Sequence, residues 1–236
     1  MIKEMSPLEK KIKIKFKNKE LLKRALTHRS YLNEHSSFKI EHNERLEFLG
    51  DAVLELIITE YLYKKYQENE GVLTSWRASL VNTNMLAKIA EEISLDKYLF
   101  LSEGEKKSSS SRTKSTILAD AFEALIGAIY LDAGMAKTKK FIEEKIIKKL
   151  PRVLKYRLYE DPKSRLQEIV QAEHKVTPGY LVLKEEGPDH DKKFTMGVFC
   201  GEKMLAQAQG VNKQEAGVRA AAEALKKYYK KIKKKS

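Results

Sequence analysis

The sequence predicts a multi-domain protein in which an all-α domain is followed by a smaller α+β domain. Residues 6–150 carry apolar side chains at helical spacing and give almost no signal for strands. Around residues 151–162 this pattern stops, because the segment is strongly charged, contains two prolines and has no long apolar stripe. We therefore expect an all-α domain over residues 1–152, a linker over 153–160, an α-β-β-β-α domain over 161–230 and a basic tail over 231–236.

The expected helices of the first domain follow from apolar periodicity and from the polar segments between the stripes. They span residues 19–32, 42–66, 73–91, 115–133 and 136–149. Segment 102–116 is polar, basic and rich in serine. It is either a mobile loop or the approach to the helix that begins near Ile117, and loops beside a site often carry function.

The second domain is expected to contain two helices and three strands. Its elements are a helix over 163–174, strands over 179–186, 192–200 and 203–210, and a helix over 212–229. The turn GPDHD joins the first two strands. Helical spacing places Leu166, Ile169 and Val170 on one face of the first helix, which we expect to be buried.

The composition is strongly basic, with 46 lysines and arginines against 33 aspartates and glutamates and a net charge of +13. Such a surplus favours a polyanionic partner, either nucleic acid or an anionic membrane surface. The apolar runs are too short to span a membrane, and the first residues lack the apolar core of a secretory signal. We expect no membrane partner and a cytoplasmic location. A lone cysteine, Cys200, excludes a disulfide framework and a Cys-rich zinc site, so a metal site would use oxygen ligands.

Two apolar helices carry carboxylates where a packed protein would favour none. In the expected helix 42–66, Glu44, Glu47 and Asp51 share one face, while the opposite face is apolar and includes Leu56. Residues 117–131 are apolar nearly all round, and their only charges are Asp120 and Glu123. Buried carboxylates without a nearby cation are costly. The pattern indicates a metal site with oxygen ligands, which favours Mg²⁺ or Mn²⁺.

These segments resemble the bacterial ribonuclease III family. HNERLEFLGDAVL at 42–54 is similar to the signature motif of that family, and ILADAFEALIGAIYLDAG at 117–134 is similar to its second acidic helix. The segments ALTHRSYLNE and EGVLTSWRASLV resemble further family segments in the expected order. Residues 161–229 resemble a double-stranded-RNA-binding domain, including the turn GPDH.

The resemblance implies an all-α endonuclease domain followed by an α+β double-stranded-RNA-binding domain. It implies a homodimer that uses Mg²⁺, with Mn²⁺ as a substitute, to cut both strands of duplex RNA. The products would carry 5′-phosphate and 3′-hydroxyl ends with short 3′ overhangs, and the substrates would be precursors of ribosomal and messenger RNA.

The matching positions imply roles for individual residues. The implied catalytic residues are Glu44, Glu47, Asp51, Asp120 and Glu123, and all of these except Glu44 are implied metal ligands. Glu44 is a supporting acid, either orienting a ligand or paired with Arg45 or another helix. Phe48 matches a dimer-interface plug, and Glu70 matches a further acid near the valley between subunits. The histidines outside the turn show no metal-binding spacing and are interpreted as ordinary residues: His28, His35, His42 and His174.

The resemblance also implies a set of RNA contacts in the second domain. Duplex RNA is recognised mainly by shape and by phosphate and 2′-hydroxyl contacts across the minor groove. The implied contacts are Gln167, Gln171, His190, Lys192, Lys193, Asn212 and Lys213. The start of the last helix departs from the family, since Val211 and Gln214 stand where lysines are usual. The basic stretch at residues 226–235 is either a phosphate-binding arm or a disordered solubilising end.

Other functions would place different demands on the carboxylates and on the basic second domain. The carboxylates could be held by salt bridges in a purely structural helical core. A non-catalytic RNA binder is expected to have lost at least one of the four metal-binding acids, and all four are intact. A phosphohydrolase acting on nucleotides would not need the basic second domain, and a basic ribosome-associated protein would not need acids in a buried helix.

Overall fold

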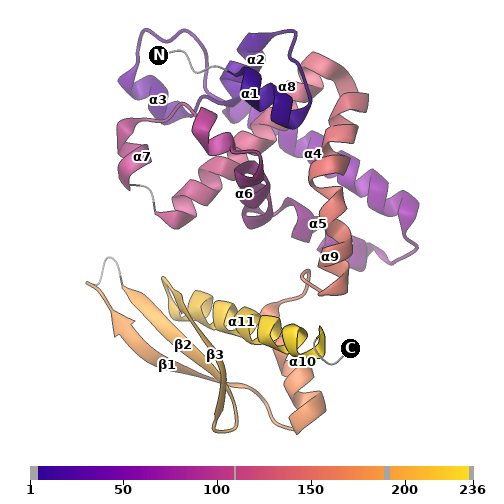
Figure 1. Ribbon diagram of the computed structural model, residues 1–236, viewed down its shortest axis with the longest axis vertical. Coiled ribbons are helices and arrows are strands. Elements are labelled where there is room, and N and C mark those ends of the chain that lie inside the picture. Colours follow the sequence, from indigo (N-terminus) through magenta and orange to yellow (C-terminus); the bar gives the residue numbers. More distant parts are fainter. Residues whose placement is uncertain (1–4, 109, 189–191, 234–236) are drawn as a thin grey trace. The chain divides into compact units, whose positions relative to one another are not determined.

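The computed structural model describes residues 5–108, 110–188 and 192–233. It divides into two compact units, Met1–Val153 and Leu154–Ser236 (Figure 1). The first unit is helical and the second combines helices with a three-stranded sheet, which confirms the predicted fold class. Among the helices of these described ranges, none is long and apolar enough to cross a membrane.

Two long helices, α4 and α8, pack against each other at the centre of the first unit. Their facing sides are apolar, and Leu54, Ile58, Leu125 and Ile129 are fully buried. This burial supplies most of the favourable free energy that holds the pair together. The elements of the unit are α1 (Ser6–Ile12), α2 (Lys19–Ala25), α3 (Arg29–Glu34), α4 (Glu44–Lys65), α5 (Glu70–Val81), α6 (Thr83–Glu92), the 3-10 helix η1 (Leu95–Tyr98), α7 (Glu103–Ser108), α8 (Ser111–Lys145), the 3-10 helix η2 (Ile147–Lys149) and α9 (Leu150–Lys155), which crosses the boundary between the units.

The expected helix 19–32 is wrong, because the structure has two helices, α2 and α3, in its place. Between them, Thr27 pairs with Phe100 in an isolated bridge. The Thr27 carbonyl also accepts a hydrogen bond from the Asn43 backbone N–H at 2.9 Å. These contacts with distant segments satisfy backbone groups that a continuous helix would have used internally.

The expected helix 73–91 is also wrong, because α5 and α6 meet at a break. Asn82 has extended backbone angles, with φ −69° and ψ 154°. Its side-chain oxygen accepts a hydrogen bond from the Met85 backbone N–H at 3.0 Å, so Asn82 caps the start of α6. The apolar periodicity runs through the break, and only the capping preference of asparagine could have indicated it.

Segment 102–116 is largely helical, since it contains α7 and the first turn of α8. The Ser110 hydroxyl accepts a hydrogen bond from the Thr113 backbone N–H at 3.2 Å and caps α8. Helix α8 contains the expected helix 115–133 and most of the expected helix 136–149, whose last residues form η2, and Gly134 marks the kink between the two parts. The φ of Gly134 is 78°, a conformation that glycine adopts without steric penalty.

The second unit has the predicted α-β-β-β-α order. The three strands form an antiparallel sheet in the order β1-β2-β3, with Val182 opposite Met196 and Val198 opposite Ala206. Side chains of both helices and of the inner sheet face form a single apolar core. The elements are α10 (Pro162–His174), β1 (Gly179–Glu186), β2 (Lys193–Cys200), β3 (Lys203–Gly210) and α11 (Lys213–Lys233).

Candidate metal centre and RNA-binding face

Two glycines allow α4 and α8 to approach until their backbones touch. A Cβ on Gly50 would lie 1.8 Å from the Glu123 carbonyl oxygen. A Cβ on Gly127 would lie 2.3 Å from the Leu46 carbonyl oxygen. Any side chain larger than hydrogen at these positions would separate the helices. This close crossing brings the acidic turn of α4 against the acidic turn of α8.

Three carboxylates meet at the crossing. Glu47 comes from α4, and Asp120 and Glu123 come from successive turns of α8. One carboxylate oxygen of each lies within 4.8 Å of the others, and all three side chains are half-buried. We call these three residues the acidic cluster.

Burial and mutual repulsion disfavour the charged forms of the acidic cluster. Burial raises the pKa of Glu123 to about 8, and the carboxylates of Asp51, Asp120 and Glu47 contribute to this rise. The pKa of Glu47 is raised to about 6, mainly by burial and then by Asp120. Burial also raises the pKa of Asp120. A cation beside these groups would therefore favour their ionisation near neutral pH.

The protein itself supplies no such cation among the residues that the structure describes. None of the ion pairs found there involves Glu47, Asp120 or Glu123. Close, half-buried oxygen ligands without a basic partner suit a divalent cation of the hard, oxygen-binding type. The donor set therefore fits the divalent metal that the sequence predicts.

Two of the sequence-predicted acids lie beside the cluster rather than in it. Asp51 is exposed one turn after Glu47, and its charge acts on both Glu47 and Glu123. Glu44 has partners of its own, with Arg29 Nη1 at 3.4 Å and His42 Nδ1 at 3.7 Å. The pairing of Glu44 with Arg45 is not found, and its partners come instead from α3 and from the loop before α4.

Three large apolar side chains lie exposed along α4, and one of them is the predicted plug residue Phe48. Phe48 is 81% exposed, Leu56 is 58% exposed and Tyr63 is 76% exposed. We call these three residues the apolar stripe. Leu56 belongs to the apolar face that the sequence predicts for this helix, and it is exposed because no described element of the unit covers that side of α4.

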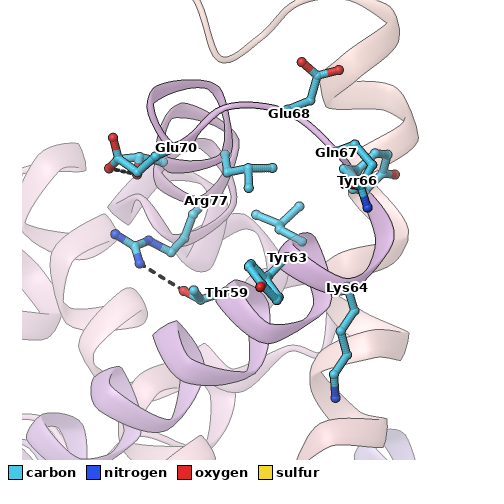
Figure 2. Close-up of a pocket in the computed structure, with 11 residues that line it drawn as sticks. Thr59, Tyr63, Lys64, Tyr66, Gln67, Glu68, Glu70 and Arg77 are labelled. Atoms are coloured by element: carbon cyan, nitrogen blue, oxygen red, sulfur yellow. Dashed lines mark hydrogen bonds between the residues drawn. The ribbon is translucent and has the colours of Figure 1, made fainter.

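A pocket of about 700 Å³ lies at the end of the apolar stripe, between α4 and α5 (Figure 2). Tyr63, Leu62 and Leu73 give it apolar walls, and Arg77 crosses it to donate a hydrogen bond to the Thr59 hydroxyl at 2.9 Å. Glu70, predicted as a further acid, also lines it and accepts a hydrogen bond from the Thr74 hydroxyl at 3.0 Å. Sequence reasoning missed this pocket, because no local pattern indicates a hollow between helices.

The predicted RNA contacts of the second unit fall on α10, on the start of β2 and on the start of α11. Gln167 and Gln171 are exposed on α10, and Gln171 donates a hydrogen bond to the Thr177 hydroxyl at 3.3 Å. Lys193 is exposed at the first position of β2. Asn212 precedes α11, and its side chain accepts a hydrogen bond from the Glu215 backbone N–H at 2.8 Å. His190 lies outside the described residues.

Two of the predicted lysines share one carboxylate. Lys213 Nζ lies 3.0 Å from Glu185 Oε1, and Lys192 Nζ lies 3.5 Å from Glu185 Oε2. Both ammonium groups also lie over the ring of Phe194, at 5.5 and 6.0 Å from its centroid. Glu185, which the sequence did not single out, therefore joins the start of β2 to the start of α11.

Two family models match this chain and account for most of its length. Residues 18–150 match a model described as ribonuclease-III-like, and residues 162–228 match the double-stranded RNA binding motif. The helical unit with its acidic cluster and the α-β-β-β-α unit are thus a nuclease domain and an RNA-binding domain. The protein is of the class of double-strand-specific endoribonucleases, which use a divalent metal.

Curated proteins and solved structures agree with that class. Ribonuclease 3 of a Nitratiruptor species is 43% identical over 226 residues, covering 95% of this chain and 97% of that protein. Ribonuclease 3 of Streptococcus pneumoniae is 45% identical over 221 residues, covering 93% and 94%. A crystal structure of the nuclease domain of ribonuclease III from Campylobacter jejuni is 41% identical, with a TM-score of 0.55, and covers 63% of this chain and 97% of that one. The chain belongs to the ribonuclease III family.

Proposed function

We propose that this enzyme hydrolyses phosphodiester bonds in both strands of duplex RNA with Mg²⁺ held by acids of α4 and α8. The observation that carries the proposal is the acidic cluster, whose carboxylates meet half-buried and without a basic partner among the described residues. A bound divalent cation would offset the burial and the mutual repulsion that raise their pKa values. Mn²⁺ would substitute, because it accepts the same oxygen ligands.

The proposed metal ligands are Glu47, Asp51, Asp120 and Glu123. When bound, divalent metal would supply an activated water and relieve the charge on the leaving 3′ oxygen. The residues of the chain hold the site: Gly50 and Gly127 set the distance between the two helices, and the apolar surroundings limit access of bulk water. Asp51, which is exposed and one turn from Glu47, would join the cluster as a fourth ligand.

Glu44 is proposed as a supporting catalytic residue rather than a metal ligand. Its carboxylate already faces Arg29 and His42, so it does not need a metal to offset its charge. It lies one turn before Glu47 and raises the pKa of that residue. Its contribution would be to hold the basic groups of the neighbouring loop and helix beside the acidic cluster.

A homodimer is proposed from the apolar stripe and the pocket at its end. In a symmetric dimer the same surface is used by both copies, so two α4 helices would cross about a two-fold axis. An axis near Leu56 would bring Phe48 of one copy close to Tyr63 and the pocket of the other, because these residues lie at similar distances on either side of Leu56. The exposed Phe48 ring offers apolar surface that such a pocket would bury.

The second unit is proposed to hold duplex RNA through Gln167, Gln171, Lys192, Lys193, Asn212 and Lys213, together with His190. The observation that supports this face is the common anchoring of Lys192 and Lys213 by Glu185, which places two cations together. Cations at this spacing suit neighbouring phosphates of a duplex.

The proposed products carry 5′-phosphate and 3′-hydroxyl ends with short 3′ overhangs, since each subunit would cut one strand. The proposed natural substrates are stems in precursors of ribosomal and messenger RNA, which would place the enzyme in the cytoplasm. The test is digestion of a long, perfect RNA duplex by the full-length protein with Mg²⁺, with Mn²⁺ and with EDTA, followed by analysis of the ends. Blunt products, 5′-hydroxyl ends or cleavage in EDTA would contradict the proposal.

A further inference from the structure

A group of lysines lies on the first unit, where the part of α8 that follows the kink at Gly134 ends beside α1. Lys11 belongs to the last turn of α1 and Lys13 follows it, while Lys145 and Lys148 come from the end of α8 and from η2. The two segments touch, because Lys145 Nζ donates a hydrogen bond to the Lys11 carbonyl at 3.4 Å. We call these four residues the lysine patch.

The acids around the lysine patch are already occupied. Glu144 Oε2 lies 3.7 Å from Lys13 Nζ. Glu92 accepts hydrogen bonds from Lys149 through both carboxylate oxygens, at 2.5 and 2.7 Å. Within the described part of the chain, no ion pair is found for Lys145 or Lys148. The patch therefore has more positive charge than its own surroundings neutralise.

Lys145 is the least favourably placed of these cations. Its side chain is half-buried, and its ammonium group donates a hydrogen bond to a backbone carbonyl rather than to a carboxylate. Burial lowers the pKa of Lys145, and the ammonium groups of Lys148 and Lys13 lower it further, against opposite effects of Glu144 and Glu92. This is the converse of the acidic cluster, where carboxylates lack a cation.

A simple solvated surface is the usual explanation of a lysine-rich face. It accounts for exposed lysines, which repel one another only weakly in water. It does not account for a half-buried lysine that feels the charges of two other lysines while the neighbouring acids, Glu144 and Glu92, are already paired with Lys13 and Lys149. An anion with several charges would remove that repulsion, and RNA is the polyanion on which this class of enzyme acts.

We propose that the lysine patch is an additional RNA-binding surface, which takes the sugar–phosphate backbone of the substrate outside the duplex segment held at the acidic cluster. Its role would be to bind the flanking parts of long substrates and so to favour them over short ones. Because lysine ammonium groups contact phosphates as point charges, this surface would select by charge and length and not by base sequence. The proposal rests on RNA being the substrate, and not on the metal mechanism.

The test uses the full-length triple variant Lys13→Gln/Lys145→Gln/Lys148→Gln. A matched control, Lys39→Gln/Lys88→Gln/Lys203→Gln, removes the same charge from exposed lysines elsewhere. Binding is measured in EDTA, so that no RNA is cut, over a range of salt concentrations. The probes are a duplex of about 16 base pairs, the length one such RNA-binding module spans, and the same duplex extended by duplex or by single-stranded arms.

For the extended probes, we expect the patch variant to bind about tenfold more weakly than the wild type at low salt. The slope of log affinity against log salt concentration should fall by about 2 to 3, close to 0.9 for each lost phosphate contact. The short duplex should bind patch variant, control variant and wild type alike. If the patch variant loses affinity only for the probe with duplex arms, or only for the probe with single-stranded arms, the result would support the proposal and identify the form of RNA that is bound.

Two outcomes would overturn the proposal. If patch and control variants bind every probe equally, the patch is a solvated surface. If the patch variant loses the same affinity for the short duplex, these lysines act on the segment that is cut. Cleavage of the short duplex with Mg²⁺ tests the proposed function separately, because it depends on the acidic cluster. Thermal unfolding shows that the patch variant is folded, since the substitution removes the Lys13–Glu144 ion pair and the Lys145 hydrogen bond along with mutual repulsion.

Discussion

Gly127 of α8 lies against Gly50 of α4, so that a Cβ on Gly127 would be 3.2 Å from the Gly50 backbone nitrogen. This contact decides where the acidic cluster forms. Glu47 lies nearly one turn before Gly50, and Glu123 lies about one turn before Gly127. The distance between the carboxylates of the two helices therefore follows from the absence of two side chains.

Gly50→Ala should separate the helices and impair both stability and metal binding. The new methyl group would meet the Glu123 carbonyl oxygen, and overpacking of this kind lowers the free energy of unfolding by about 3 kcal/mol or more. Denaturant unfolding and Mn²⁺ titration would measure the two effects. Gly71→Ala is the matched control, because its nearest neighbour is a side-chain oxygen at 3.6 Å. Equal stability of Gly50→Ala and wild type would disprove the tight crossing.

The stability of the metal-free protein should fall as pH rises through neutrality. Folding raises the pKa of Glu123 from its usual 4.5 to about 8, so the folded state holds a proton that the unfolded state releases between these values. The stability linked to this proton is present below pH 4.5 and is lost as pH approaches 8. The melting temperature should therefore fall over this range in EDTA, more steeply for wild type than for Glu123→Gln.

Divalent metal should reverse this pH dependence, because binding to the ionised carboxylates favours the folded state. At high pH, the melting temperature of the wild type should be higher with Mg²⁺ than in EDTA. The same difference should be much smaller for Glu123→Gln. An identical pH profile for the two proteins in EDTA would show that Glu123 ionises normally.

Phe48→Glu should convert the proposed dimer to monomers. A carboxylate on this exposed position would have to lose its water on entering an apolar pocket, which is unfavourable by several kcal/mol. Sedimentation analysis over a range of concentrations measures the change. Leu158→Glu, at an exposed apolar residue of the second unit, serves as the control. A Phe48→Glu protein that remains dimeric would place the interface elsewhere.

Lys213→Gln should weaken duplex binding and reduce its salt dependence. Loss of one phosphate contact lowers the slope of log affinity against log salt by about 0.9. Lys203→Gln, on an exposed lysine of β3, should leave the slope unchanged. If both variants behave like the wild type, the start of α11 does not contact RNA, and Glu185 holds Lys213 for a structural purpose.

The sequence was sufficient to predict the fold class and the acids that meet in the acidic cluster. Glu47, Asp120 and Glu123 were predictable because carboxylates on otherwise apolar helices are conspicuous. The apolar pattern also predicted most helices, but it missed the breaks at Thr27 and Asn82. At Thr27 the cause is hydrogen bonding with segments distant in the sequence, which no local pattern contains.

Other features required the three-dimensional structure. The contacts of Glu44 with Arg29 and His42 join three segments that only the fold brings together. The pocket beside Tyr63 depends on the angle between α4 and α5. The exposure of Leu56 in the apolar stripe was not predictable, because periodicity shows that a face is apolar, and not whether it is covered within one chain.

The most direct test of the account is cleavage of a long RNA duplex in saturating Mg²⁺ by wild type, Glu123→Gln and Glu44→Gln. Glu123→Gln should retain duplex binding and lose cleavage completely, because it removes charge from the acidic cluster alone. Glu44→Gln should cleave slowly, with the Mg²⁺ requirement of the wild type, because its carboxylate pairs with Arg29 and His42. Wild-type cleavage by Glu123→Gln would contradict the central claim that the acidic cluster is the metal centre of this enzyme.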